Sequence, residues 1–231
     1  MMIICPSRGR PDRCLEMAKS FRATSSIACL KVLIDFDDPL INEYDKVGQY
    51  ASIIKDFRKT TTERINDSWK GASECFKFFG VTNDDFIYRT DRWDEMLLAS
   101  LDAFGGSGIA YGNDLLQGIR IPTTSLISRD IIEALGWLQM PRLIHLYGDN
   151  VWAHIGNRVG CLLYRQDVII EHRHFHAGKS VEDETYKRTN SSKMYDDDRA
   201  NFIKWLYNEC RDDIEKVKGV VEKTRLFIRN Q

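Results

Sequence analysis

The sequence predicts an α/β fold with a mostly parallel, Rossmann-like central sheet, flanking helices and a C-terminal helical extension. Three observations predict this fold class. Apolar, strand-like runs alternate with segments of helical periodicity through the first half of the chain, which is the order that a parallel sheet with covering helices requires. With 231 residues and 43% hydrophobic content, the chain can bury a full core. From residue 196 onward, apolar side chains recur at helical spacing.

The first half is predicted to form strands at 2–5, 30–34, 50–54 and 86–88 and helices at 12–22, 61–79 and 93–104. Pro6 stops the first apolar run, and Thr61 or Thr62 can cap the second helix. An apolar stripe continues along that helix to residue 79, and Gly80 is the residue type that commonly follows a helix end.

The second half is more mixed. It is predicted to form strands at 109–111 and 119–127, helices at 129–136 and 149–155, two short strands within 161–171 and a helical tail from 196. The stretch 177–198 is polar, and we expect it to be mobile. We divide the chain into one domain over residues 1–190 and a helical extension over residues 191–231 that packs on it.

Composition limits the classes of function. Acids and bases number 34 and 33, so the net charge is −1, and a nucleic-acid role would need a local basic patch. The six cysteines are scattered without a C-x-x-C pair, which favours free thiols in a reducing compartment. No apolar run approaches the ~18 residues of a membrane span, and no signal peptide is evident. We therefore expect a soluble, cytoplasmic protein without a membrane partner.

Polar clusters lie beside three of the predicted strands. They are Ser7–Arg10, Asp35–Asp38 and Asn83–Asp85. Because ligands of parallel α/β sheets bind beyond the carboxyl ends of the strands, these clusters are candidate ligand contacts. The sequence has no G-x-G-x-x-G, Walker or G-x-S-x-G motif that would name a more specific chemistry.

Two patterns suggest a divalent metal. Asp84 and Asp85 could hold Mg²⁺ or Mn²⁺ together with substrate phosphates, or could belong to an Asx-rich turn. His172, His174 and His176 stand at alternate positions, so an extended strand would place them on one face. At least one could be a ligand or contact a phosphate; alternatively, they lie on a solvated edge strand. Zinc is disfavoured, because no cysteine or histidine pair elsewhere completes a tetrahedral set.

Other candidates have both a structural and a functional interpretation. Asp149 could cap a helix or act as a general base toward a hydroxyl group. Arg64 and Asn66 could face an anion at a helix N-terminus or simply face water. Arg8 and Arg10, on a tight loop after the first strand, suit a phosphate or nucleotide but could also cap the sheet edge.

Taken in order, several segments resemble one enzyme family. They read IICPSRGRP, DFDDP, TERIN, FFGVTNDDFIYRTDRWDEML, HLYGDNVWAHIG and VIIEHRHFHAGKSVEDETY, and they fall within residues 2–187. Together they resemble the nucleotide-sugar glycosyltransferases of the GT-A fold, in particular the compact glycosyltransferase-like proteins of bacteriophages. The chain departs from the family at the metal motif, which reads Asn-Asp-Asp where the family has Asp-x-Asp.

The resemblance implies a role for each matching residue. The residues implied to bind the nucleotide-sugar donor are Pro6, Arg8, Arg10, Asp35, Arg64, Asn66 and Asp84. Asp85 with His172 or His174 would hold Mn²⁺ or Mg²⁺, and we expect His172 to be the better candidate. Asp149 would activate the acceptor hydroxyl, with Trp152 packed behind it.

The family implies an enzyme that moves a sugar from a nucleoside-diphosphate sugar, with a UDP-sugar favoured, to an acceptor hydroxyl. A phage relative would modify a hydroxymethylated pyrimidine in viral DNA, and a base in a duplex would have to be flipped out. A saccharide or glycan acceptor is the alternative. A catalytically inactive nucleotide-sugar-binding protein and a metal-dependent phosphohydrolase are the remaining hypotheses.

Overall fold

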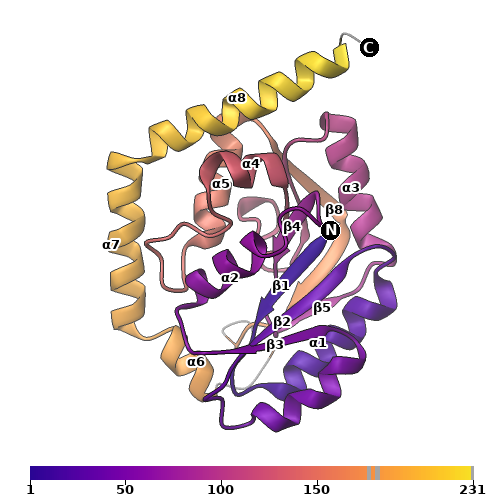
Figure 1. Ribbon diagram of the computed structural model, residues 1–231, viewed down its shortest axis with the longest axis vertical. Helices are drawn as coiled ribbons and strands as arrows, with labels where there is room; N and C mark the ends of the chain where they lie inside the picture. The colour runs from indigo at the N-terminus through magenta and orange to yellow at the C-terminus, as the bar shows by residue number, and fades with distance from the viewer. Residues whose placement is uncertain (176–177, 180–182, 230–231) are drawn as a thin grey trace.

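The computed structural model describes residues 1–175, 178–179 and 183–229 and forms one eight-stranded sheet with helices on both faces (Figure 1). The strands are β1 (Met2–Pro6), β2 (Cys29–Asp35), β3 (Ser52–Asp56), β4 (Phe78–Val81), β5 (Phe86–Tyr88), β6 (Ile109–Asn113), β7 (Ser125–Ser128) and β8 (Leu162–His172). They lie in the order β3-β2-β1-β4-β7-β6-β8-β5. His176, the third member of the histidine row, lies outside the described residues.

The sheet is mostly parallel, as predicted. Strands β3, β2, β1 and β4 run parallel to one another, and β6 runs parallel to β8. β7 is antiparallel to both of its neighbours, and β5 is antiparallel to β8. The carboxyl ends of β1, β2 and β4 therefore meet at one edge, where ligands of such sheets bind.

Helices cover the two faces. They are α1 (Pro11–Thr24), α2 (Thr61–Lys70), α3 (Trp93–Phe104), α4 (Arg129–Leu135), α5 (Gly148–Val159), α6 (Glu184–Thr189), α7 (Ser192–Asn208) and α8 (Cys210–Arg229), with short 3₁₀ helices η1 (Ile41–Gln49) and η2 (Gly118–Arg120). No helix within the described part of the chain is long and apolar enough to cross a membrane.

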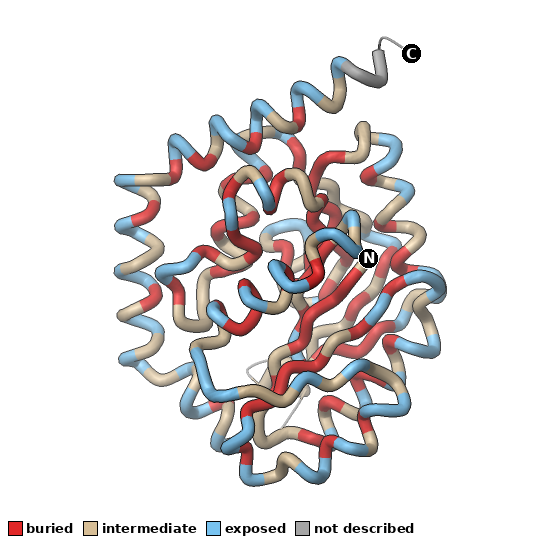
Figure 2. Tube along the Cα trace, in the orientation of Figure 1, coloured by how far each residue is buried: buried red, intermediate tan, exposed pale blue. Residues whose placement is uncertain are grey.

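Alternation along β1 separates two hydrophobic cores. Met2 and Ile4 point to the core shared with α2, α4 and α5, whereas Ile3 and Cys5 point to the core shared with α1 and α3. Figure 2 shows β1 as a buried band between exposed helix surfaces. Because both faces of this strand are covered, its sequence is a continuous apolar run rather than an alternating one.

The C-terminal helices belong to the first of these cores. Trp205 of α7 and Val217 of α8 are fully buried against the residues of α4 and α5. The guanidinium of Arg225 lies 4.0 Å from the ring centroid of Phe104, which attaches the far end of α8 to α3. Helices α7 and α8 therefore pack against α3, α4 and α5, while the division of the chain into a domain and an extension at residue 190 stays a prediction.

The helix predicted at 61–79 is wrong beyond Lys70, because residues 78–81 form strand β4 instead. Gly80 does not end a helix: it lies where a Cβ atom would approach the carbonyl oxygen of Ser125 to 2.5 Å and Ile3 Cδ1 to 2.7 Å. Glycine is required there because β1 and β7 pack closely against β4. The pattern of apolar residues extends past the end of the helix, because the buried strand that follows contains the same residue types.

The structure also bears on three other stretches of the predicted fold. The strand predicted at 119–127 is confined to Ser125–Ser128, and η2 occupies Gly118–Arg120. The pair of short strands predicted within 161–171 is a single strand, β8, whose pairing register with β6 shifts after Gly112. The stretch predicted to be mobile contains α6 and the first turns of α7 among its described residues.

Candidate functional site

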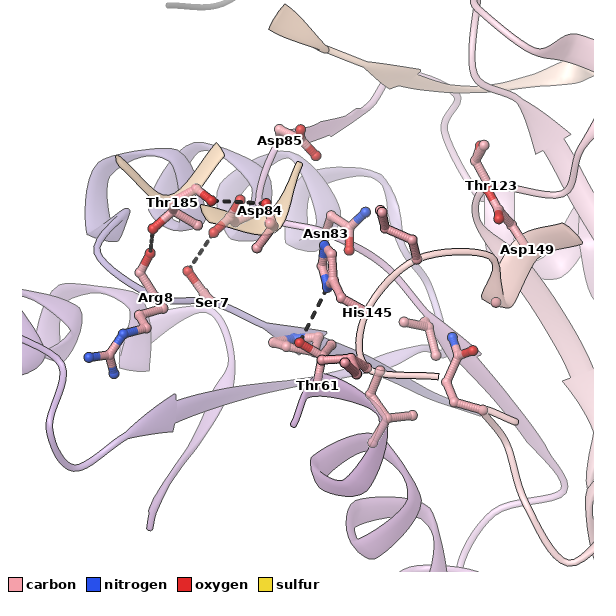
Figure 3. A pocket seen from close by; sticks show the side chains of 18 of the residues that line it. Ser7, Arg8, Thr61, Asn83, Asp84, Asp85, Thr123, His145, Asp149 and Thr185 are labelled. Atoms are coloured by element: carbon pink, nitrogen blue, oxygen red, sulfur yellow. Dashed lines mark hydrogen bonds between the residues drawn. The ribbon is translucent and has the colours of Figure 1, made fainter. Parts of the chain in front are cut away.

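A cavity of about 630 Å³ opens at the carboxyl ends of β1, β2 and β4. It is lined by nearly all the residues singled out in the sequence: Pro6, Arg8, Arg10, Asp35, Arg64, Asp84, Asp85, Asp149, His172 and His174. Residues more than 160 positions apart in the chain thus share one cavity. Figure 3 shows Asp84 and Asp85 on one side and Asp149 across the cavity, beside Thr123.

Asn66 is the exception, since it is absent from the cavity lining. Its Nδ2 donates to the carbonyl oxygen of Gln139 at 2.7 Å, and its Oδ1 accepts from the backbone N–H groups of Leu138 and Gln139. All the hydrogen bonds seen for the side-chain amide of Asn66 are made with residues 138–139. We therefore correct the donor-binding assignment: Asn66 supports the cavity wall from behind.

The loop after β1 is fixed by a buried network. Ser7 Oγ donates to Asp84 Oδ2 at 2.7 Å and lies 2.9 Å from the hydroxyl of Tyr44, which also accepts from the backbone N–H of Arg10. Arg10 reaches Asp84 Oδ1 at 3.2 Å and binds both carboxylate oxygens of Asp183, at 2.6 and 2.8 Å. This network links β1, β4 and the start of α6.

A second network lies at the end of β2. Asp35 accepts from Arg8 at 3.0 Å and from Arg64 at 2.5 Å, and Arg8 also binds Asp37 at 2.6 Å. Two guanidinium groups thus flank one largely buried carboxylate. At the rim of the cavity, burial lowers the pKa of Arg188. Repulsion from the guanidinium groups of Arg8 and Arg58 lowers it further.

Asp84 and Asp85 differ in electrostatics although they are adjacent. Burial raises the pKa of Asp84 to about 6, against the opposing effect of Arg10. Burial also acts on Asp85, but there the imidazole of His172 and the guanidinium of Arg10 outweigh it, so the pKa of Asp85 lies below its ordinary value. Of the two carboxylates, Asp85 therefore has the lower pKa.

Asp85 and His172 form the best candidate for a metal centre. Asp85 Oδ2 lies 3.4 Å from His172 Nε2, while Asp85 Oδ1 is buried and has no hydrogen-bond partner among the described residues. A buried carboxylate oxygen without a partner is costly unless a cation or water satisfies it. Across residues 1–175, 178–179 and 183–229, no set of three or more metal-ligating side chains is clustered. The donor set fits a divalent cation that takes its remaining ligands from a phosphorylated substrate.

The geometry separates the roles of His172 and His174. β8 pairs His172 with Phe86 of β5, and the two rings stack with centroids 4.2 Å apart, which fixes the imidazole beside Asp85. The His174 ring contacts that of His172 edge-on at 4.9 Å and lies within 2.7 Å of the Tyr186 hydroxyl. His174 is therefore held by α6, and His172 is the better-placed candidate ligand.

Asp149 lies in the first turn of α5, where Tyr147 and Gly148 bring it to the cavity. Tyr147 adopts a left-handed backbone conformation with φ 67°, which is uncommon for a residue with a Cβ atom. Burial raises the pKa of Asp149, and the described residues supply its carboxylate with one hydrogen bond, from the N–H of Asn150 at 2.9 Å. Trp152, one turn further along α5, is buried and also lines the cavity, and its indole N–H donates to the carbonyl of Leu138.

Sequence reasoning missed several residues of this site. The hydroxyl of Tyr44 lies 2.9 Å from Ser7 Oγ and holds the β1 loop. His145 lines the cavity with its Nδ1 3.3 Å from Thr61 Oγ1 (Figure 3). Asp198 of α7 accepts the backbone N–H groups of residues 144–146. The partners of these three residues are distant in the chain and leave no local signal.

The cavity thus has two chemically distinct parts. We call the part lined by residues 6–8, 10, 35, 64, 83–85 and 172 the β1 side, and the part lined by residues 116–117, 122–123, 139, 144–149 and 152 the α5 side. The β1 side holds arginines, carboxylates and the Asp85–His172 pair. The α5 side presents the carboxylate of Asp149. Such an arrangement can bind a phosphorylated ligand on one side and remove a proton on the other.

No protein-family model and no curated protein sequence matches the chain. Solved structures do match. The mannosyltransferase PcManGT from Pyrobaculum calidifontis, in complex with GDP-Man and Mn²⁺, superposes with a TM-score of 0.60 at 9% identity, over 94% of this chain and 72% of that chain. TarS from S. aureus, residues 1–349 in complex with UDP, superposes with a TM-score of 0.56 at 10% identity, over 73% of this chain and 58% of that chain.

A third similar structure is glucosyl-3-phosphoglycerate synthase from Mycobacterium tuberculosis, in complex with Mn²⁺, UDP and phosphoglyceric acid. It superposes with a TM-score of 0.52 at 14% identity, over 77% of this chain and 72% of that chain. The chain shares the fold of these proteins, and the GT-A fold class predicted from the sequence is confirmed.

Proposed function

We propose that this chain is a metal-dependent glycosyltransferase that moves a sugar from a nucleoside-diphosphate sugar to an acceptor hydroxyl. One observation carries the proposal: a single cavity joins the Asp85–His172 pair to Asp149 on the opposite side, and Asp85 Oδ1 has no hydrogen-bond partner in the described part of the chain. A bound diphosphate and an activated hydroxyl need these two kinds of group. Glycosyltransferases of similar fold, two of them solved with Mn²⁺, support the assignment.

The β1 side is proposed to bind the donor. Arg8, on the loop after β1, pairs with Asp35 at the end of β2, and their guanidinium and carboxylate groups can contact the nucleoside. A uridine donor is favoured. Arg64 lines the same part of the cavity. Asp85 and His172 would hold Mn²⁺ or Mg²⁺. A metal bound there would offset the negative charge that develops on the departing nucleoside diphosphate.

The α5 side is proposed to activate the acceptor. Asp149 offers a carboxylate with a raised pKa and one observed hydrogen bond, so its free lone pairs can accept a proton. In this mechanism Asp149 takes the proton of the acceptor hydroxyl as its oxygen attacks the anomeric carbon. The bond from that carbon to the diphosphate breaks, and direct displacement inverts the anomeric centre.

For the acceptor we propose a hydroxymethylated pyrimidine in phage DNA, with a saccharide or glycan as the alternative. Arg58, Lys59 and Arg188 lie around the mouth of the cavity, where they could contact DNA phosphates. A base from a duplex would have to be flipped out to reach Asp149. Binding to hydroxymethylated DNA that weakens steeply with added salt would support this acceptor, and absence of binding at low salt would exclude it.

The proposed function is tested by thermal-shift measurements with nucleotide sugars, with and without Mn²⁺. A donor that binds only the folded state raises Tm by mass action, so we expect a stabilising shift that requires both the matching nucleotide sugar and the metal. Release of the nucleoside diphosphate from that donor then measures turnover. Equal stability with and without every donor, together with no release of diphosphate, would contradict the proposal.

A further inference from the structure

Asp198 of α7 holds the loop that leads to Asp149. Its two carboxylate oxygens accept three consecutive backbone N–H groups, from Ile144 at 2.7 Å, His145 at 2.9 Å and Leu146 at 2.7 Å. The residue is fully buried and does not line the cavity. A buried carboxylate with three converging donors fixes a loop strongly, because hydrogen bonds to a charged acceptor are the stronger kind and the buried charge requires them.

The same helix also fixes the next residue of the chain. The ring of Tyr147 stacks on Phe202 of α7 at 5.3 Å and lies 5.6 Å from the ring of Tyr195. Tyr147 has a positive φ, and Gly148 follows it where a Cβ atom would lie 2.1 Å from Gln139 Oε1. A strained conformation of this kind persists only where its surroundings impose it, and here α7 supplies those surroundings.

We propose that Asp198 is a positioning residue for the reaction. By holding residues 144–146 from outside the cavity, it sets the path of the chain into α5 and thereby the place of the Asp149 carboxylate opposite the donor. This inference rests on the proposed function of the cavity. It adds that the loop of the α5 side is held in place by helix α7, whereas the β1 side is held by contacts among residues 7–10, 35, 64, 84 and 183.

The chain contains a matched control for this proposal. Asp94, in the first turn of α3, is also fully buried and accepts three consecutive backbone N–H groups, those of Ser26, Ile27 and Ala28 at 2.7–3.1 Å. None of these residues lines the cavity. Replacing either aspartate by asparagine keeps the shape of the side chain. Only one side-chain oxygen is then left to accept hydrogen bonds, and the amide N–H₂ group faces the backbone N–H donors.

The test compares Asp198→Asn, Asp198→Glu and Asp94→Asn, each assayed below its own Tm. We expect Asp198→Asn to lower kcat for sugar transfer by about 10–100-fold, because a displacement of about 1 Å in a catalytic group has effects of that size. The KM for the donor and its Mn²⁺-dependent affinity should stay within about twofold, since the β1 side is untouched. Asp198→Glu should recover part of kcat, and Asp94→Asn should keep wild-type kcat despite a lower Tm.

Amide hydrogen exchange provides a readout that does not depend on activity. Residues 144–146 should exchange faster in Asp198→Asn than in the wild type, and equally fast in the wild type and Asp94→Asn. Unchanged exchange in Asp198→Asn would overturn the proposal, and so would a kcat that falls equally in Asp198→Asn and Asp94→Asn. If the wild-type protein itself turns over no donor, the proposed function fails, which is a result distinct from either of these.

Discussion

The two sides of the cavity are built in opposite ways. On the β1 side, arginines and carboxylates are cross-linked: Arg8 and Arg64 share Asp35, and Arg10 joins Asp84 to Asp183. On the α5 side, Asp149 has one observed hydrogen bond, and its loop is held from outside the cavity. A binding surface gains from groups that are fixed before the ligand arrives, whereas a general base needs free lone pairs. The β1 side is therefore built as a binding surface should be, and the α5 side as a general base requires.

The largest effect is expected from a substitution that alters the α5 side alone. Asp149→Asn removes the proton acceptor but keeps the shape, so kcat should fall by about 10²–10⁴-fold while donor affinity stays near that of the wild type. Steady-state transfer kinetics and donor titration measure the two quantities separately. Asp102→Asn, on the exposed surface of α3, serves as the control. Loss of donor affinity in Asp149→Asn, or retention of the anomeric configuration in the product, would remove Asp149 from the role of simple base.

The next largest effect is expected from a substitution on the β1 side. Asp85→Ala removes the carboxylate whose Oδ1 has no partner among the described residues, so Mn²⁺-dependent donor affinity should fall by about 100-fold or more, with turnover falling alongside it. Calorimetric titration of the donor with Mn²⁺ and with chelator measures the change. Donor binding at wild-type strength in Asp85→Ala would refute the metal assignment.

The smallest effect concerns pH and the α5 side. Burial lowers the pKa of His145 below 6.5, against the opposing attraction of Asp198, so the folded protein binds fewer protons at this residue than the unfolded chain. The free energy of unfolding should therefore decrease as pH falls below about 6.5. Urea unfolding of the wild type and of His145→Gln at pH 7.5 and 5.5 measures this contribution. The wild type should lose more stability than the variant, and an equal loss in both would contradict the assignment.

The sequence predicts the β1 side better than the α5 side. The clusters at residues 7–10, 35–38 and 83–85 each stand beside an apolar strand, so local pattern and the rule for parallel sheets together bring them to one edge. For Asp149, the family resemblance implies a role as general base, whereas the local pattern favours a helix cap. Asp198 could not be predicted, because its partners are backbone groups more than 50 positions away, and backbone groups leave no mark in a sequence.

Errors in the fold prediction have a similar cause. The helix predicted to residue 79 ends at Lys70 because tertiary packing, rather than periodicity, decides the conformation of residues 78–81 between β1 and β7. Gly80 was interpreted as the end of a helix, since a sequence does not show that a neighbouring strand leaves no room for a Cβ atom. Asn66 was assigned to the ligand for the same reason: its true partners at 138–139 are distant in the chain.

The register shift in β8 has a consequence for how the protein can vary. Gly112 of β6 pairs with Arg165, but its neighbour Asn113 pairs with Ile169, and beyond this point β8 pairs with β5 and delivers His172 beside Asp85. Gln166 and Asp167, within the shift, are exposed, so many side chains can stand there. The number of residues in this segment is restricted, because adding or deleting one residue would turn His172 to the opposite face of the sheet. The structure therefore restricts the length of this segment more tightly than its composition.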